Sequence, residues 1–197
     1  MACGSWNVVL TALSRATKKM KKLEKFLDYL LTNEVFRAII KVQKRKELIQ
    51  MMEITINFDM DGTIADLYGV KNWLPYLEAE DTTPYAIAKP LLNLSALARK
   101  LNTLQKNGYR LAIISWTSKS GSKEYNARVT EAKKAWLAEH LPSVHWDEIN
   151  IVPYGTPKHF FCHNPLDILF DDEEKNRIGW TGIPHDVQNI MEILREI

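Results

Sequence analysis

Two aspartates follow a short apolar run early in the second quarter of the chain. The run 54–58 contains isoleucine and phenylalanine and is followed by Asp59, Asp61 and Gly62. Residues two apart on an extended stretch point to the same side, so both carboxylates can face one ligand, and the glycine permits a sharp turn. Two like charges this close are costly unless a cation holds them, which predicts a metal site.

A second acidic group stands after a later apolar run. Asp171 and Asp172 follow the run 167–170, and two glutamates come next. Parallel strands end at the same edge of a sheet, where ligands bind, so this pair can converge on Asp59 and Asp61. Taken alone, four acids in a row would also suit the exposed start of a helix. Taken together, the two groups predict a shared site for a cation that prefers oxygen ligands, such as Mg²⁺.

The segment Asp59-Met-Asp-Gly-Thr63 resembles the first motif of the haloacid dehalogenase-like (HAD) hydrolase superfamily. The apolar run before it and Ile64-Ala-Asp66 after it strengthen the resemblance. The pair Asp171-Asp172, placed after a strand, resembles the fourth motif of the same superfamily. The resemblance covers about residues 53–197 and is to a compact, near-capless phosphatase.

The second and third motifs are weaker patterns, and their order along the chain is what supports them. The second is a strand ending in serine or threonine, which fits the run 111–115 and Ser115, with Thr117 as a competing hydroxyl. The third is a lone basic residue, which fits Lys158, with Lys119 as its competitor. Outside this order, such a serine is usually a satisfied hydroxyl and such a lysine is usually solvated.

The resemblance implies a two-step transfer of a phosphoryl group. Asp59 would attack phosphorus and form an aspartyl-phosphate. Asp61 would protonate the leaving oxygen and then deprotonate the water that releases phosphate. Ser115 and Lys158 would bind the phosphoryl oxygens. An acid at position 61 favours a phosphatase or a phosphotransferase within the superfamily.

The same resemblance implies Mg²⁺ as the cofactor. Its protein ligands would be Asp59, the backbone carbonyl of Asp61, and Asp172 with or without Asp171. Oxygen ligands of this kind, completed by water and a phosphate oxygen, suit Mg²⁺.

Alternating strand and helix patterns must position these residues. Strands separated by helical segments indicate a parallel sheet with helices on both faces. We therefore expect an α/β fold: a three-layer Rossmann-like (HAD-like) parallel sheet with a minimal cap, preceded by a basic helical N-terminal extension. The expected strands are 54–58, 111–115, 149–152 and 167–170, and the expected helices are 91–106, 123–140 and 187–197.

The segment 66–88 is too short for a full helical cap domain, but it can form a small lid or flap. Its apolar side would consist of Trp73, Leu74, Tyr76 and Leu77. Residues 116–148 are accounted for by a loop and one helix, so no second cap is expected. A site of this kind is open, which suits a larger substrate or closure by a partner.

The spacing around the acidic pair somewhat resembles the 5′-(deoxy)nucleotidase branch, which favours a nucleotide as the substrate. Trp116, with Trp73 or Tyr154, could stack on a nucleobase. Because the chain contains six tryptophans, packing in the core is the alternative for these rings.

The cysteines indicate no disulfide framework, because Cys3 and Cys162 lie far apart in a chain without a secretory pattern,. A zinc site at His159, Cys162 and His163 is a further alternative, but a second pair of ligands is missing.

The first 51 residues differ in charge from the rest of the chain. They hold 11 lysines and arginines against 4 aspartates and glutamates, whereas residues 52–197 hold 15 against 20. Apolar residues at helical spacing predict one or two basic amphipathic helices, with a break and an N-cap at Thr32-Asn33. These apolar residues are Leu23, Phe26, Leu27, Leu30, Leu31, Val35, Phe36, Ile39, Ile40 and Val42.

Three interpretations of residues 1–51 stay open. They are an amphipathic appendage packed on the domain or on another copy, contact with an anionic membrane surface, and contact with nucleic acid. Met52 stands immediately before the first strand and would be a natural start for residues 52–197, the HAD-like domain. The segment before it can therefore be a dispensable extension or a start-site artefact.

The 197 residues, 46% of them apolar and 25% charged, suit one globular domain with a small appendage,. No apolar run approaches the length of a membrane span, and no signal-peptide pattern is present, so we expect a soluble cytoplasmic protein. The expected function is hydrolysis of a small phosphate monoester such as a nucleotide. The alternatives are a phosphatase of nucleic-acid ends and a non-catalytic phosphoryl-binding or assembly module that retains the fold.

Overall fold

The computed structural model describes residues 17–26, 29 and 33–197. The chain divides into two compact units, Met1–Leu48 and Ile49–Ile197. Within the described residues, no helix is both long enough and apolar enough to cross a membrane.

The described part of the first unit is helical. Residues 17–26 form helix, and α2 spans Glu34–Met52. The side-chain oxygen of Asn33 accepts hydrogen bonds from the backbone N–H groups of Val35 and Phe36 at 3.0 and 3.2 Å, which confirms the predicted N-cap,. The predicted positions Cys3, Leu27, Leu30, Leu31 and Thr32 lie outside the described residues.

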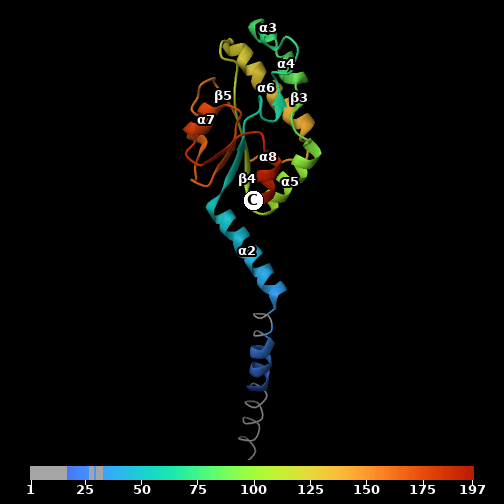
Figure 1. Cartoon of the computed structure of the whole chain (residues 1–197), viewed down its shortest axis with the longest axis vertical. Coiled ribbons are helices and arrows are strands. Elements are labelled where there is room, and N and C mark those ends of the chain that lie inside the picture. Colours follow the sequence, from blue (N-terminus) through green and yellow to red (C-terminus); the bar gives the residue numbers. More distant parts are fainter. Residues whose placement is uncertain (1–16, 27–28, 30–32) are drawn as a thin grey trace, which may run out of the picture. The chain divides into compact units, whose positions relative to one another are not determined.

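The second unit begins with the last turn of α2, where Ile49 is 6% exposed and belongs to the core. Its centre is a parallel sheet of five strands in the order β5-β4-β1-β6-β7 (Figure 1). β1, the strand before Asp59, therefore lies in the middle of the sheet. The strands are β1 (Thr55–Phe58), β4 (Arg110–Trp116), β5 (Glu148–Val152), β6 (Ile168–Phe170) and β7 (Ile183–His185).

Side chains along the central strands alternate between two apolar faces, as the two-residue period of a strand requires. Ile56 and Ile113 lie in the larger core cluster, whereas Ile114, Leu169 and Trp180 form a smaller cluster of their own. Full burial of each such side chain contributes roughly 1.5–3 kcal/mol to folding. The predicted three-layer α/β class is confirmed. Three helices contribute side chains to the larger core: α5 (Leu94–Lys106), α6 (Lys123–His140) and α8 (Ile190–Glu196). The smaller cluster adjoins η1 (Lys158–Phe161) and α7 (Glu174–Gly179).

Side-chain caps fix where the two long helices after β1 begin. The side chain of Asn93 accepts a hydrogen bond from the N–H of Ala96 at 3.0 Å, so α5 starts three residues later than predicted,. The hydroxyl of Ser122 accepts from the N–H of Tyr125 at 3.1 Å, and α6 has the predicted bounds.

The segment between β1 and α5 forms a small flap, in agreement with the predicted minimal cap. Strands β2 (Ala65–Asp66) and β3 (Lys89–Pro90) pair antiparallel, and α3 (Trp73–Glu78) and α4 (Thr83–Ile87) lie between them. The carboxylate of Glu80 accepts hydrogen bonds from the backbone and hydroxyl of Ser122 at 2.6 and 2.7 Å. The indole of Trp136 donates to the carbonyl of Ala88 at 2.7 Å. These bonds fasten the flap to α6.

Strand β7 and helix α7 were not among the elements predicted from the sequence. β7 has three residues with a proline in the middle, and it lies at the edge of the sheet, where a missing N–H is tolerated,. α7 has six residues and buries none of them, so it shows no apolar period,.

Candidate functional site

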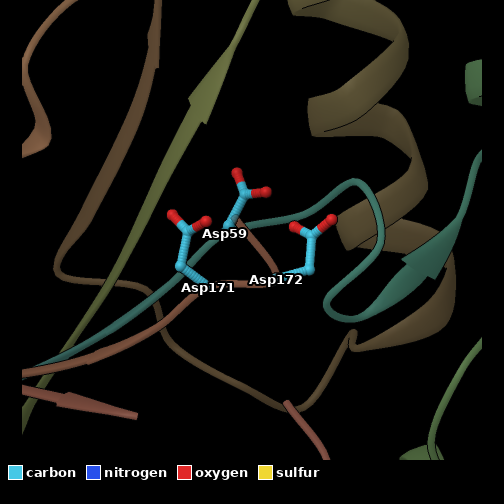
Figure 2. A group of neighbouring side chains, drawn as sticks. All are labelled: Asp59, Asp171 and Asp172. Carbon is cyan, nitrogen blue, oxygen red and sulfur yellow. The ribbon is translucent and has the colours of Figure 1, made fainter. Parts of the chain in front are cut away.

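Three carboxylates converge at the edge of the sheet where β1 and β6 end. The hydrogen bonding of these two strands continues one step further, since the N–H of Asp59 donates to the carbonyl of Phe170 at 2.9 Å. One oxygen from each of Asp59, Asp171 and Asp172 lies within 4.8 Å of the others. Figure 2 shows the three side chains pointing to the same side. The structure thus brings Asp171 and Asp172 together with Asp59, as expected of adjacent parallel strands, whereas the side chain of Asp61 is not part of this cluster.

A tight turn directly after Asp59 brings the chain against Asp172. The carbonyl of Met60 accepts hydrogen bonds from the backbone N–H groups of Thr63, Ile64 and Ala65, at 3.2, 3.0 and 2.9 Å. Gly62 has φ +80°, and a Cβ added there would lie 2.5 Å from Oδ2 of Asp172. Backbone conformation and close approach to a carboxylate both require glycine at this position.

Lys158 is the cation beside this group of aspartates. It is the first residue of η1, and its Nζ lies 2.9 Å from Oδ1 of Asp59 and 2.6 Å from Oδ2 of Asp171. Burial by itself would lower the pKa of Lys158, but the two carboxylates outweigh it and raise the pKa, so the ammonium stays charged,. The competing Lys119 lines the cavity described below, with its Nζ 5.6 Å from the centre of the Tyr154 ring.

The two aspartates after β6 differ in how many protein groups they bind. Asp171 accepts from Lys158, from the side chain of Asn176 at 3.1 and 3.2 Å, and from the N–H of Glu173 at 2.9 Å. Burial raises the pKa of Asp171, and so does Asp59, while Lys158 opposes both. The carboxylate of Asp172 makes a long contact, 3.5 Å from the hydroxyl of Thr63, while its backbone carbonyl accepts a hydrogen bond from Arg177 at 2.7 Å. Burial, together with the charges of Asp59 and Asp171, raises the pKa of Asp172 to about 7.

This charge balance suits a divalent cation. The three clustered carboxylates share one ammonium, that of Lys158, so fully ionised they carry excess negative charge in a partly buried place. Like charges in such surroundings are stabilised only by further positive charge. A donor set of oxygen atoms alone fits a hard cation, and Asp172 has the most capacity left to bind one.

Asp61 points to a different partner. Its Oδ2 lies 2.6 Å from Nζ of Lys133, and its side chain is not among the three clustered carboxylates. Burial raises the pKa of Asp61, Lys133 lowers it, and Asp59 raises it again. The metal role that the resemblance implies for Asp61 belongs to its backbone carbonyl, and it stays a prediction.

Lys133 also holds the end of β4. Its side chain is 1% exposed, and its Nζ donates to the hydroxyl of Ser115 at 2.8 Å and to the carbonyl of Trp116 at 2.7 Å. Ser115 is itself buried and lines the cavity described below, as does Thr117, whose backbone N–H bonds the carbonyl of Val152 at 2.8 Å. The structure therefore places Ser115 next to the partner of Asp61.

Lys133 was not among the site residues predicted from the sequence, although its position in α6 carries a signal. The buried face of α6 is formed by residues at helical spacing, and Lys133 falls on that face one turn after Val129 and one turn before Leu137,. A lysine in an apolar stripe needs a buried partner, which is a reason to look for one.

A cavity of about 370 Å³ opens over Asp59 and Asp61. The flap supplies much of its apolar wall, including Trp73, Leu74 and Leu77 from the predicted set, whereas Tyr76 is not among the lining residues. The remaining aromatic lining residues are Tyr68, Tyr85, Trp116 and Tyr154.

The rings of Trp116 and Tyr154 form one side of this cavity. Their centres lie 4.8 Å apart at an angle of 56°, and the indole N–H donates to the carbonyl of Thr156 at 2.9 Å. The indole is therefore fixed in orientation.

The zinc alternative is not supported. His159 and Cys162 lie on and just after the short helix η1, and within the described part of the chain only the three aspartates meet the spacing of a metal site.

Comparisons with known proteins add little. No protein-family model matches the chain, and no curated protein sequence matches it. Among solved structures, the chain is similar to D,D-heptose 1.7-bisphosphate phosphatase from B. bronchiseptica, complexed with magnesium and phosphate. The similarity covers 66% of this chain and 78% of the other, at 13% sequence identity and a TM-score of 0.43.

Proposed function

We propose that the second unit is a Mg²⁺-dependent phosphate monoester hydrolase that works through an aspartyl-phosphate on Asp59. One observation carries the proposal: Asp59 belongs to a cluster of carboxylates with a buried lysine and also lines a cavity, with Asp61 two residues further on. A nucleophile, a metal site, a cation and a general acid thus meet at one end of the sheet.

Each of these groups has a role that its contacts support. Asp59 faces the cavity and attacks phosphorus, and Asp61, which also lines the cavity, gives a proton to the leaving oxygen,. The Lys158 ammonium stabilises the charge that develops on the phosphoryl oxygens, and the hydroxyl of Ser115 donates a hydrogen bond to them.

The residues that would hold Mg²⁺ are Asp59, Asp172 and the backbone carbonyl of Asp61. The carboxylate of Asp171 accepts hydrogen bonds from Lys158 and Asn176, so its role would be to hold Lys158 in place beside the metal ligands. When bound, the ion neutralises charge on the phosphoryl group and orients it.

A small phosphate ester with a flat group, such as a nucleotide, is the substrate class that the cavity favours. A volume of about 370 Å³ is in the range of small-molecule sites,. The fixed indole of Trp116 and the ring of Tyr154 line the cavity beside the ammonium of Lys175, whose Nζ lies 4.6 and 5.3 Å from the two ring centres, and these are the rings on which a base would stack,.

The proposal is tested by a screen of phosphate esters with the full-length protein. p-Nitrophenyl phosphate, nucleoside monophosphates and sugar phosphates are each supplied with Mg²⁺ or with EDTA, and released phosphate is measured. We expect Mg²⁺-dependent turnover, with nucleoside monophosphates ahead of sugar phosphates. Turnover of no ester, or turnover that EDTA leaves unchanged, would contradict the proposed function.

Mg²⁺ should also stabilise the fold, and more so at higher pH. In the metal-free protein the pKa of Asp172 is raised to about 7, above its unfolded value, so its contribution to stability falls as the pH rises towards 7,. Mg²⁺ bound to the ionised carboxylate of Asp172 would supply the positive charge that the lost proton no longer provides. We expect added Mg²⁺, at a free concentration about a hundredfold above its Kd, to raise the melting temperature by about 5–10 °C at pH 8. At pH 5 the increase should be much smaller.

The measurement is a thermal melt with Mg²⁺ or EDTA at the two pH values. Asp172→Asn should lose most of the increase, while Glu139→Gln, an exposed change of the same kind on α6, should keep it. An equal increase at both pH values would contradict the linkage to Asp172.

A further inference from the structure

We propose that Lys133 is a positioning residue, which holds Asp61 and Ser115 in the orientations that the reaction needs. The inference rests on the proposed function and adds a residue to it. It starts from the buried ammonium of Lys133, which lies between the carboxylate of Asp61 and the hydroxyl of Ser115 at the end of β4.

The three N–H groups of Lys133 match three acceptors. They are Oδ2 of Asp61 at 2.6 Å, Oγ of Ser115 at 2.8 Å and the carbonyl of Trp116 at 2.7 Å. An ammonium has three donors, so these contacts use all of them. No donor is left for a phosphoryl oxygen, and Lys133 therefore acts through its partners rather than on the substrate.

The contact with Ser115 sets the direction of its hydroxyl. Because the serine oxygen accepts a hydrogen bond from Lys133, its own O–H points away from the ammonium and is free to donate,. Ser115 lines the cavity, where the available acceptor would be a phosphoryl oxygen. Lys133 thereby makes Ser115 a donor towards the substrate.

The contact with Asp61 holds a side chain on a tight turn. A single rotatable carboxylate beside an open cavity would otherwise sample several orientations, and a shift of about 1 Å at a catalytic group lowers the rate on the order of a hundredfold. Lys133 reaches Asp61 from α6, a long helix that is fastened to the flap, so the proton donor is fixed to a rigid element.

The surroundings of Lys133 are otherwise apolar, which argues against a role in stability alone. Its Nζ lies 5.2 Å from the centre of the Tyr85 ring, which belongs with Tyr125 and Val129 to an apolar cluster beside the flap. At such a place an apolar side chain of similar size is usually as stabilising as a buried ion pair, or more so. The ion pair of Lys133 with Asp61 is therefore explained by the groups that it holds in place, the Asp61 carboxylate and the Ser115 hydroxyl.

Lys133→Met tests the inference through the leaving group of the substrate. The p-nitrophenolate group needs little protonation, whereas an alkoxide such as that of glycerol phosphate needs a well-placed acid. We expect kcat/KM to fall on the order of 10²-fold or more for the alkyl phosphate and by about tenfold or less for the aryl phosphate. Loss of the Ser115 donor affects both substrates alike, so the ratio of the two values isolates Asp61.

Two further variants make the result decisive. Lys134→Met, the exposed neighbour on the same helix, should match the wild type on both substrates. Adding Lys133→Met to Asp61→Asn should leave the ratio where Asp61→Asn alone puts it, because the two residues act as one unit. This double variant also pairs two neutral side chains and so avoids a buried unpaired charge if Lys133→Met folds poorly.

The outcomes separate the two proposals. Equal losses on both substrates would overturn the positioning of Asp61 by Lys133, and no loss at all would overturn the role of Lys133 altogether, while the wild-type activity stands. A change of the ratio in the Asp61→Asn background would also overturn it. A wild type that hydrolyses neither ester would refute the proposed function, and the role of Lys133 with it.

Discussion

Asp59→Asn should remove phosphatase turnover almost completely, with a loss on the order of 10⁴-fold or more in kcat. An amide is a far weaker nucleophile than a carboxylate and cannot form the acyl phosphate. The fold should survive, because asparagine has nearly the same size and the change removes one of three clustered like charges. Released phosphate measured with Mg²⁺ gives the rate, and a thermal melt should show a melting temperature equal to or above that of the wild type.

A chemical trap makes this result specific. Acid quenching of the wild type during turnover should leave one phosphoryl group on the peptide that contains Asp59, seen by mass spectrometry, and the variant should carry none. Glu139→Gln, an exposed acid-to-amide change, should behave as the wild type does. Undiminished turnover in Asp59→Asn would end the assignment of the nucleophile.

Lys158→Met should reduce both activity and stability. Its Nζ contacts Asp59 and Asp171 and its side chain is 1% exposed, so removing the charge leaves two buried carboxylates without their ammonium. The expected loss of unfolding free energy is about 3–5 kcal/mol in EDTA, and Mg²⁺ should restore part of it. The expected loss in kcat/KM is about 10²–10³-fold, the usual effect of removing a charge-stabilising donor.

These effects are measured by denaturant unfolding and by steady-state kinetics. Lys106→Met, an exposed lysine at the end of α5, serves as the matched control and should change neither quantity. If Lys119→Met lost more activity than Lys158→Met, the phosphate-binding cation would be Lys119, and the role given to Lys158 would be wrong.

The carboxylate cluster could be predicted from the sequence because it depends on a rule that applies to every parallel sheet. Two strands that run the same way end at the same edge, so the residues after 54–58 and after 167–170 had to meet if the strands were adjacent. The structure has β1 and β6 as neighbours, and Asp59, Asp171 and Asp172 do meet. Which of the two later aspartates has the freer carboxylate could not be predicted, because that depends on the contacts of Lys158 and Asn176.

Lys133 could not be placed from the sequence for a related reason. Its position in α6 marks it as buried, but its partners come from the turn after β1 and from the end of β4, and nothing local to α6 names them. The same holds for the cavity wall. The apolar side of the flap was expected to consist of Trp73, Leu74, Tyr76 and Leu77, but which of these side chains would face the cavity depends on how the flap docks on α6.

The central position of β1 has a consequence for when the carboxylate cluster can form during synthesis. β1 pairs with β4, where Thr55 stands beside Arg110, and with β6, where Ile56 stands beside Ile168. Long stretches of chain must therefore close before either pairing forms, which makes folding slow relative to proteins with local contacts. Asp59 leaves the ribosome early but gains its neighbours only after nearly the whole chain has followed. A nascent chain that ends before Ile168 would expose one side of β1 as an unpaired strand, where aggregation begins.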